Sequence, residues 1–384
     1  MKKLRFMQVG WMLLLAALVL GVSFISPALA SNRAARHTNA ATAPGTSTTA
    51  INTLVYLTLG MLQPQFQQHL DQQVPVTVNS DINSIVGTMP TQDQAWARTM
   101  ATTLIQPNAT LQSLVPRQNG LDMTIQVALY PGDPQPITAS ILVSFSVLDS
   151  STVQVSTSPL SGPTLSSGPQ STFQVPIGVL TAIKSTPNCG SSALAMNLQI
   201  PVSVGQTAAT STQTLAAQAS LSGHGNPMAV KLNSNTRDNS SDNTFIEIPA
   251  SELASLSSSV GNIPVGNNFT AQNMRISVQG QTLQLLSDIY WAGINLGTAT
   301  TTIVPGASGG NLVMNVTNTS FSLFGLFNFP MNSYNQQIEQ ILNTKIGNAF
   351  AGMFTVATAA IGPNSQLPCA KSDSLVLSGT STIG

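Results

Sequence analysis

The clearest helical pattern in the chain covers residues 334–357 and directly follows a cluster of phenylalanines. Apolar residues recur there at spacings of three and four, which is the period of one helical face. Polar residues, Asn343 and Lys345 among them, lie between and make up the opposite face. The pattern therefore predicts a long amphipathic helix, whose apolar face consists of Tyr334, Ile338, Ile341, Leu342, Ile346, Ala349, Phe350, Met353 and Ala357.

Alternation of apolar and polar residues predicts long strands elsewhere in the chain. It is strictest in residues 121–129 and 137–147, and it recurs in residues 194–204. A period of two with one polar face is typical of antiparallel sheets that are apolar on one side and solvated on the other. Shorter stretches of the same kind predict further strands at residues 245–248, 274–278, 283–285, 289–296, 312–316 and 374–378.

Several shorter helices are expected in the first part of the chain. Residues 51–70 show a helical stripe that Pro64 should end or kink, because proline lacks the amide donor. Residues 80–86 and 92–105 could form two more helices, the second with a core-facing side of Trp96, Met100 and Leu104. A short helix should also begin near Pro249, and the Ser, Pro and Gly content of residues 156–170 indicates a loop.

Together these elements predict an α+β fold, in which curved antiparallel sheets with long one-faced strands wrap around amphipathic helices. The polar run at residues 233–243 is the expected linker between two related halves, residues 50–232 and residues 244–384. Residues 31–49, which are rich in Ala, Thr, Asn and Ser, are expected to be a flexible linker as well.

The first thirty residues have the pattern of an export signal. A basic start is followed by an apolar stretch, residues 11–22, and by the cleavage pattern Ala28-Leu29-Ala30. The alternative is an uncleaved anchor, because residues 7–25 approach the roughly 20 residues of a spanning helix. Both alternatives place the rest of the chain in a secreted or extracytoplasmic location.

Charge argues against a nucleic-acid partner. Removing residues 1–30 takes away three of the thirteen basic residues, leaving ten against thirteen acidic ones, a net charge near −3. No basic stripe is left that could neutralise phosphates. Only 7% of all residues are charged, whereas soluble proteins have about 25%.

The two cysteines are Cys189 and Cys369, and both follow a proline closely. In an oxidising compartment a disulfide between them is the default expectation. The alternative is a pair of free, buried thiols at equivalent places in the two halves.

The sequence lacks two common motifs of catalytic and metal-binding sites. It contains neither a Gly-x-Ser-x-Gly nor a His-Glu-x-x-His motif, and His37, His69 and His224 lie far apart along the chain. We therefore predict no metal site, no cofactor and no catalytic residues, and expect the protein not to be an enzyme. A secreted hydrolase with carboxylates distant in sequence is the alternative.

The order of elements in the second half resembles a known family. A short strand leads into Ile248-Pro249-Ala250-Ser251-Glu252-Leu253, and one-faced strands and a glycine turn precede Asn311-Leu312-Val313-Met314-Asn315-Val316. With the long helix and the last strand, residues 245–379 resemble the bacterial extracytoplasmic relatives of the tubular lipid-binding proteins, with a fainter likeness across residues 51–204. The resemblance implies a curved antiparallel sheet around a long helix, with an apolar groove for acyl chains.

The width of the helix's apolar face and the aromatic cluster before it predict where such a groove lies. Phe324 and Phe327 should sit at its mouth, and a lipid or other hydrophobic small molecule is the expected partner, with contact to a membrane surface also compatible. The alternative is a dry core in a structural or adhesive surface protein. The predicted groove residues are Phe321, Phe324, Phe327, Phe329, Ile338, Leu342, Ile346, Phe350 and Met353.

Overall fold

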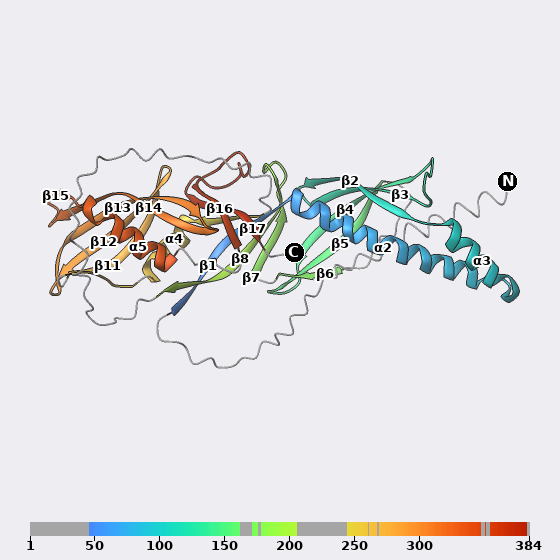
Figure 1. The fold of residues 1–384 in the computed structure, drawn as a ribbon, viewed down its shortest axis with the longest axis horizontal. Coiled ribbons are helices and arrows are strands. Elements are labelled where there is room, and N and C mark those ends of the chain that lie inside the picture. The colour runs from blue at the N-terminus through green and yellow to red at the C-terminus, as the bar shows by residue number, and fades with distance from the viewer. Residues whose placement is uncertain are drawn as a thin grey trace.

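The computed structural model describes residues 46–161, 171–175, 178–205, 244–259, 261–266, 269–346, 350 and 354–381. Three antiparallel sheets follow one another along an elongated molecule, with helices packed on the two outer sheets (Figure 1). This arrangement confirms the α+β class and the antiparallel sheets. The expected export signal, the linker at residues 233–243 and Met353 lie outside the described residues.

The central sheet takes strands from both halves of the chain, in the order β16-β17-β9-β1-β8-β7. Strand β1 lies in the middle, paired with β8 on one side and with β9 on the other. One hydrophobic cluster contains residues of all three sheets, so the core continues through this sheet. The bounds are β1 Thr46–Thr58, β7 Val179–Ser185, β8 Ser192–Gly205, β9 Thr244–Pro249, β16 Phe354–Ile361 and β17 Ser374–Ser381.

The prediction of a helix from residue 51 is wrong for residues 51–58, which belong to β1. Both faces of this strand are covered, and Val55, Tyr56 and Leu57 are all buried. A strand buried on both faces loses its alternation, and its apolar run can then imitate a helical stripe. The expected linker is also wrong for Thr46–Thr49, which pair with β8.

The first outer sheet has the strand order β2-β3-β4-β5-β6. Its strands β3 and β4 confirm the predictions for residues 121–129 and 137–147. The loop prediction for residues 156–170 is wrong as far as Ser161, because β5 pairs with β4 up to that residue. The bounds are β2 Asn108–Arg117, β3 Gly120–Ala128, β4 Ile137–Val147, β5 Thr152–Ser161 and β6 Ser171–Gln174.

Helix α2, Leu59–Gly87, packs on this sheet, and its first turn is capped by Thr58, whose hydroxyl accepts from the amide of Met61. Pro64 and Pro75 lie inside the helix, so of the two effects expected of Pro64, ending or kinking the helix, the first is wrong. Burial of one continuous row of side chains at intervals of four explains this, because tertiary packing outweighs a lost backbone hydrogen bond. The row consists of Leu62, Phe66, Leu70, Val74, Val78, Ile82 and Val86.

Helix α3, Thr91–Leu104, confirms the predicted helix but reverses its expected orientation. Trp96 is 69% exposed and Leu104 61%, so the prediction that they belong to the core is wrong. The side packed against the core instead carries Ala97 and Ala101. The largest apolar side chains of α3 therefore face solvent.

The second outer sheet has the strand order β10-β11-β12-β13-β14-β15. A turn at Ala292–Gly293 divides the stretch predicted as one strand over residues 289–296. Helix α4, Ala250–Ser259, confirms the helix expected after Pro249. The remaining bounds are β10 Ile263–Gly266, β11 Phe269–Gln279, β12 Thr282–Trp291, β13 Ile294–Ser308, β14 Asn311–Leu323, β15 Phe327–Pro330, the 3-10 turn η1 Asn332–Tyr334 and α5 Asn335–Ile346.

The predicted disulfide is present between Cys189 and Cys369, 180 residues apart. It joins the loop before β8 to the loop before β17. The two loops approach so closely that a side chain at Gly190 would overlap the carbonyl oxygen of Gln366, which explains glycine there. Disulfides of this kind persist in oxidising compartments.

Candidate functional site

A cavity of about 270 Å³ lies between α5 and the second outer sheet. Its floor comes from the inward-facing residues of β11 to β14, and α5 with η1 forms its roof. Apolar side chains dominate the lining, which consists of Ile263, Phe269, Ala271, Met274, Leu285, Ser287, Ile289, Ala299, Thr301, Thr319, Phe321, Met331, Tyr334, Gln337, Ile338, Ile341 and Leu342.

The polar groups of the floor are hydroxyls on three neighbouring strands, from Ser287, Thr301 and Thr319. The hydroxyl of Thr319 donates to that of Thr301 over 3.4 Å. All three side chains are buried, whereas Tyr334 and Gln337 are exposed at the edge of the cavity. The site can thus enclose an apolar group and place a polar group either near the hydroxyls or at the edge.

Helix α5 is held above the floor by hydrogen bonds along the edge of β14. The amide of Met314 donates to the side-chain oxygen of Asn343 (2.7 Å), and the amide of Val316 donates to Glu339 (3.0 Å). These side chains pair strand amides that β15 does not reach, because β15 pairs only with the last residues of β14. The helix therefore covers a sheet edge with its polar side while its apolar side faces the cavity.

The predicted helix is shorter than expected, because α5 ends at Ile346 and Phe354–Ala357 belong to β16. These residues pair with β17, in the register Phe354↔Ser381 and Val356↔Gly379. Pairing with a strand distant in sequence overrides the local helical period. Lys345 is also buried instead of solvated, and this burial lowers the pKa of its ammonium group.

The predicted groove residues separate into three groups. Phe321, Ile338 and Leu342 line the cavity. Ile346 and Phe350 are buried but lie outside the lining, and Phe324, Phe327 and Phe329 are exposed.

Sequence reasoning missed the floor of the cavity. Met274, Leu285 and Ile289 were recognisable as the apolar side of predicted strands, and this alternation is the signal that could have found them. Alternation does not tell which strands lie opposite a given helix, since that depends on pairing between distant segments.

Comparisons with known proteins show little similarity. No protein-family model matches the chain, and no curated protein matches it. Among solved structures, the chain is similar to P47 of Clostridium botulinum E1, with a TM-score of 0.28 and 7% sequence identity, over 88% of this chain and 100% of that chain. A similarity at this level carries no argument about function, which must be inferred from the chain's own geometry.

Proposed function

We propose that this protein is exported and binds a lipid or another hydrophobic small molecule in the cavity beneath α5. The observation that carries the proposal is the cavity itself, about 270 Å³ of space lined mainly by apolar side chains and open at the edge where Tyr334 and Gln337 lie. Native cores are close-packed, with few voids larger than a water molecule. A space of this size inside an otherwise packed sheet-and-helix layer therefore calls for an occupant.

The volume and the lining favour a slender apolar ligand. An engineered apolar cavity of about 150 Å³ stays dry and binds benzene, and ligand pockets begin near about 300 Å³. The cavity falls between these values, which suits part of an acyl chain or a comparable apolar group. Met274 and Phe321 supply adaptable apolar surface, because thioether and ring tolerate varied partners.

The proposed role is binding without catalysis. Among the described residues that line the cavity, none is Asp, Glu, His, Lys or Arg. The hydroxyls of Ser287, Thr301 and Thr319 can orient a ligand by hydrogen bonds, but no neighbouring lining residue can activate them as nucleophiles.

Export is supported by the pattern of residues 1–30 and by the disulfide between Cys189 and Cys369. Within the part of the chain that the structure describes, no helix combines the length and the apolar character needed to cross a membrane. Cleavage after Ala30 would leave a chain beginning at Ser31, which N-terminal sequencing of the exported protein checks.

Mass spectrometry of organic extracts from the purified protein tests the ligand directly. The variant Ala299→Phe places a ring in the cavity and should remove the bound molecule, with little loss of stability because the space exists. The control is Thr300→Phe, which adds the same ring on the opposite face of β13 and should leave the ligand in place.

The opposite results would support the structural alternative. An extract of the wild-type protein without any bound molecule contradicts the proposed function. A loss of about 1–3 kcal/mol in Ala299→Phe, as expected for overpacking, would show that the floor is closely packed.

A further inference from the structure

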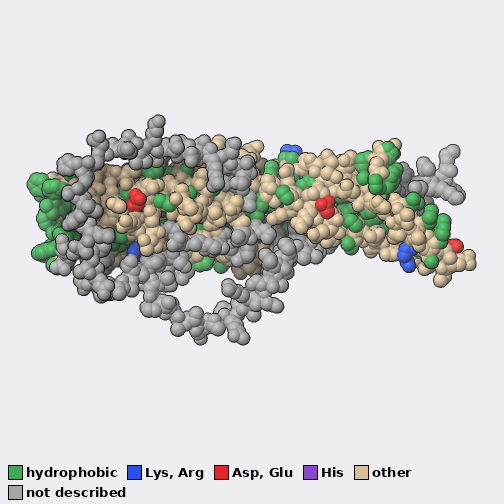
Figure 2. Space-filling view, in the orientation of Figure 1, with side chains coloured by type: hydrophobic (Ala, Val, Ile, Leu, Met, Phe, Trp, Pro, Cys, Tyr) green, Lys and Arg blue, Asp and Glu red, His purple; other side chains and the backbone are tan. Residues whose placement is uncertain are grey.

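The end of the second outer sheet that points away from the central sheet carries a cluster of large exposed apolar side chains. Figure 2 shows the corresponding hydrophobic surface at the end of the molecule where Figure 1 places β15. Leu326 is 77% exposed and Phe327 60%. We call this surface the apolar tip and define it by Phe269, Trp291, Ile294, Phe324, Leu326 and Phe327.

Strand pairing brings these residues together from three segments. Phe269 lies opposite Trp291, and Trp291 lies opposite Ile294 across the β12–β13 turn. The β14–β15 turn joins them, because the amide of Phe324 donates to the carbonyl oxygen of Leu296 (2.9 Å). The tip is therefore made of adjoining turns at one end of the sheet.

The apolar tip continues the surface that lines the cavity. Residues paired directly opposite each other in an antiparallel sheet share a face, so Trp291 lies on the same face as Phe269, a lining residue. Phe321, another lining residue, is paired with Phe329, and Phe327 follows on the same face two residues away. The cavity lining and the tip therefore share one face of the sheet, and Phe269 belongs to both.

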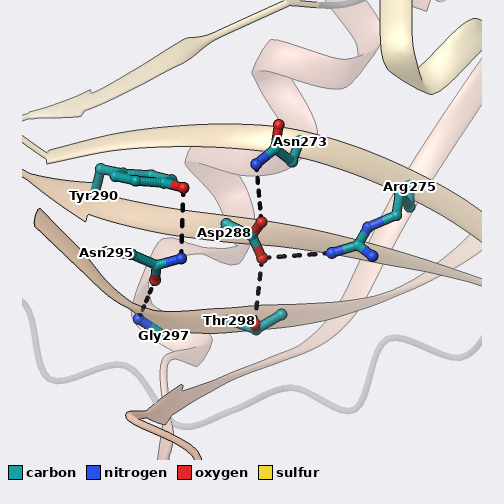
Figure 3. Close-up of polar contacts among 7 residues, drawn as sticks. All are labelled: Asn273, Arg275, Asp288, Tyr290, Asn295, Gly297 and Thr298. Carbon is teal, nitrogen blue, oxygen red and sulfur yellow. Dashed lines mark hydrogen bonds and ion pairs between the residues drawn. The ribbon is translucent and has the colours of Figure 1, made fainter. Parts of the chain in front are cut away.

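The tip has no charge of its own. The turns at residues 291–294 and 323–327 contain no Asp, Glu, Lys or Arg. The nearest charges on the same strands, Arg275 and Asp288, form an ion pair at 3.5 Å. Figure 3 shows that Asp288 also accepts hydrogen bonds from Asn273 (3.0 Å) and Thr298 (3.4 Å), so this carboxylate is held within the sheet.

The β14–β15 turn keeps an apolar residue where the backbone disfavours one. Phe324 has a φ of 49°, a conformation in which a bulky side chain is an outlier and Gly or Asn is usual. Next to it, Gly297 permits close approach of the strands, since a side chain there would overlap the carbonyl oxygen of Ser322. An exposed phenylalanine in this position does not serve core packing.

We propose that the apolar tip inserts into the surface of a lipid bilayer and sets the edge of the cavity against the membrane, so that an apolar ligand passes between them without crossing water. The inference rests on the proposed function for the identity of the ligand. The lack of charge and the composition favour a bilayer, because Trp is enriched at the membrane–water interface and Phe and Leu bury apolar surface just beneath it. Because the tip shares its face with the cavity lining, contact with a bilayer would let an apolar ligand move between the two, whereas contact with a protein would not.

Trp291 provides a direct test of insertion. Of the three tryptophans, Trp11 lies in the segment removed by cleavage after Ala30, so Trp96→Phe leaves Trp291 as the only tryptophan of the exported chain. Vesicles of zwitterionic phosphatidylcholine should shift its emission to shorter wavelength, and lipids brominated on the acyl chain should quench it. Both effects should persist in high salt, because no charge contributes. Unchanged and unquenched emission in the presence of vesicles would overturn the proposal.

Matched leucine variants locate the contact. Leu326→Asp should weaken flotation with the same vesicles about tenfold, which corresponds to about 1.4 kcal/mol. Leu104→Asp, at an exposed leucine of α3 at the other end of the molecule, should leave flotation unchanged. The proposal fails if Leu104→Asp reduces flotation and Leu326→Asp does not. It also fails if Leu326→Asp abolishes a dimer seen by sedimentation while wild-type protein ignores vesicles, since the tip would then bind a second copy.

A ligand assay in solution separates this proposal from the proposed function. With a monomeric fluorescent fatty acid and no vesicles, Leu326→Asp should bind as the wild type does, whereas Ala299→Phe should not bind. In flotation, Ala299→Phe should behave as the wild type. If the wild type floats with vesicles but does not bind the fatty acid, the proposed function fails and the docking surface stands. If it binds the fatty acid but does not float with vesicles, only the docking surface fails.

Discussion

Two neighbouring positions of α5 distinguish a ligand cavity from a dry core. Leu342 and Ile346 lie one turn apart, and their exposed fractions are only 2% and 5%. Leu342 lines the cavity and Ile346 does not. The substitutions Leu342→Ala and Ile346→Ala each remove three carbon atoms from a buried side chain, so they form a matched pair.

The expected losses of stability differ because the surroundings differ. At about 0.8 kcal/mol per methylene group, transfer alone accounts for about 2.4 kcal/mol in either variant. Around Ile346 the truncation also opens a new void, which adds about 1 kcal/mol for each ~40 Å³. Leu342 already faces empty space and forgoes packing contacts on that side. We therefore expect about 3.5 kcal/mol for Ile346→Ala and about 2 kcal/mol for Leu342→Ala.

Urea unfolding at equilibrium measures this difference. The protein must first be stripped of ligand, because a bound molecule stabilises the folded state by mass action. With a slope of about 3 kcal/mol per molar, the midpoints of the two variants should differ by about 0.5 M. Equal losses, or a larger loss in Leu342→Ala, would mean that the walls of the cavity are in contact, and would refute the reasoning from empty space.

Two further predictions concern the contact between the halves. Tyr56→Phe removes the phenol hydroxyl that donates to buried Glu247 over 2.5 Å, so it should lower the free energy of unfolding by about 1–3 kcal/mol. The other carboxylate oxygen of Glu247 keeps its hydrogen bond from the amide of Lys371. Burial and the hydrogen bond to Glu247 raise the pKa of Tyr56, so wild-type stability should fall as the pH rises above 10.0, because this tyrosine then ionises in the unfolded chain but stays neutral in the folded protein. Chemical denaturation at several pH values measures this fall, and an equally steep fall in Tyr56→Phe would contradict the prediction. Removing the Cys189–Cys369 bond, which spans 180 residues, should lower the free energy of unfolding by about 5 kcal/mol by the loop-entropy model. Thermal melts of Cys369→Ser measure this loss, and an unchanged melting temperature would contradict the prediction.

The sequence determined the elements that follow one local rule. Strands β3 and β4 were predictable because their residues alternate between a covered face and a solvated face of the sheet. The beginning of α5 was predictable because its apolar residues recur with the helical period. The disulfide was predictable from the count of two cysteines in a chain with an export pattern.

Other elements depended on neighbours that are distant in the chain. Residues 51–58 and 354–357 have apolar residues at spacings that fit a helix, yet they form β1 and β16. In each case the partner strand begins more than ten residues away, as for β16 with β17 or β1 with β8. Conversely, α2 continues through Pro64 because the protein core buries Leu62 and Phe66, which lie two residues before and two residues after the proline.

The candidate site divides in the same way. The apolar side of α5 and the phenylalanines were visible in the sequence, because periodicity shows which side of an element avoids water. Which of them enclose a cavity and which form an exposed tip was decided by the sheet, whose curvature and register set the distance between floor and roof. A period of 3.6 or 2 specifies a face, whereas an empty volume arises only when two such faces are held apart, and that separation depends on strand pairing and on the hydrogen bonds of Asn343 and Glu339 to β14.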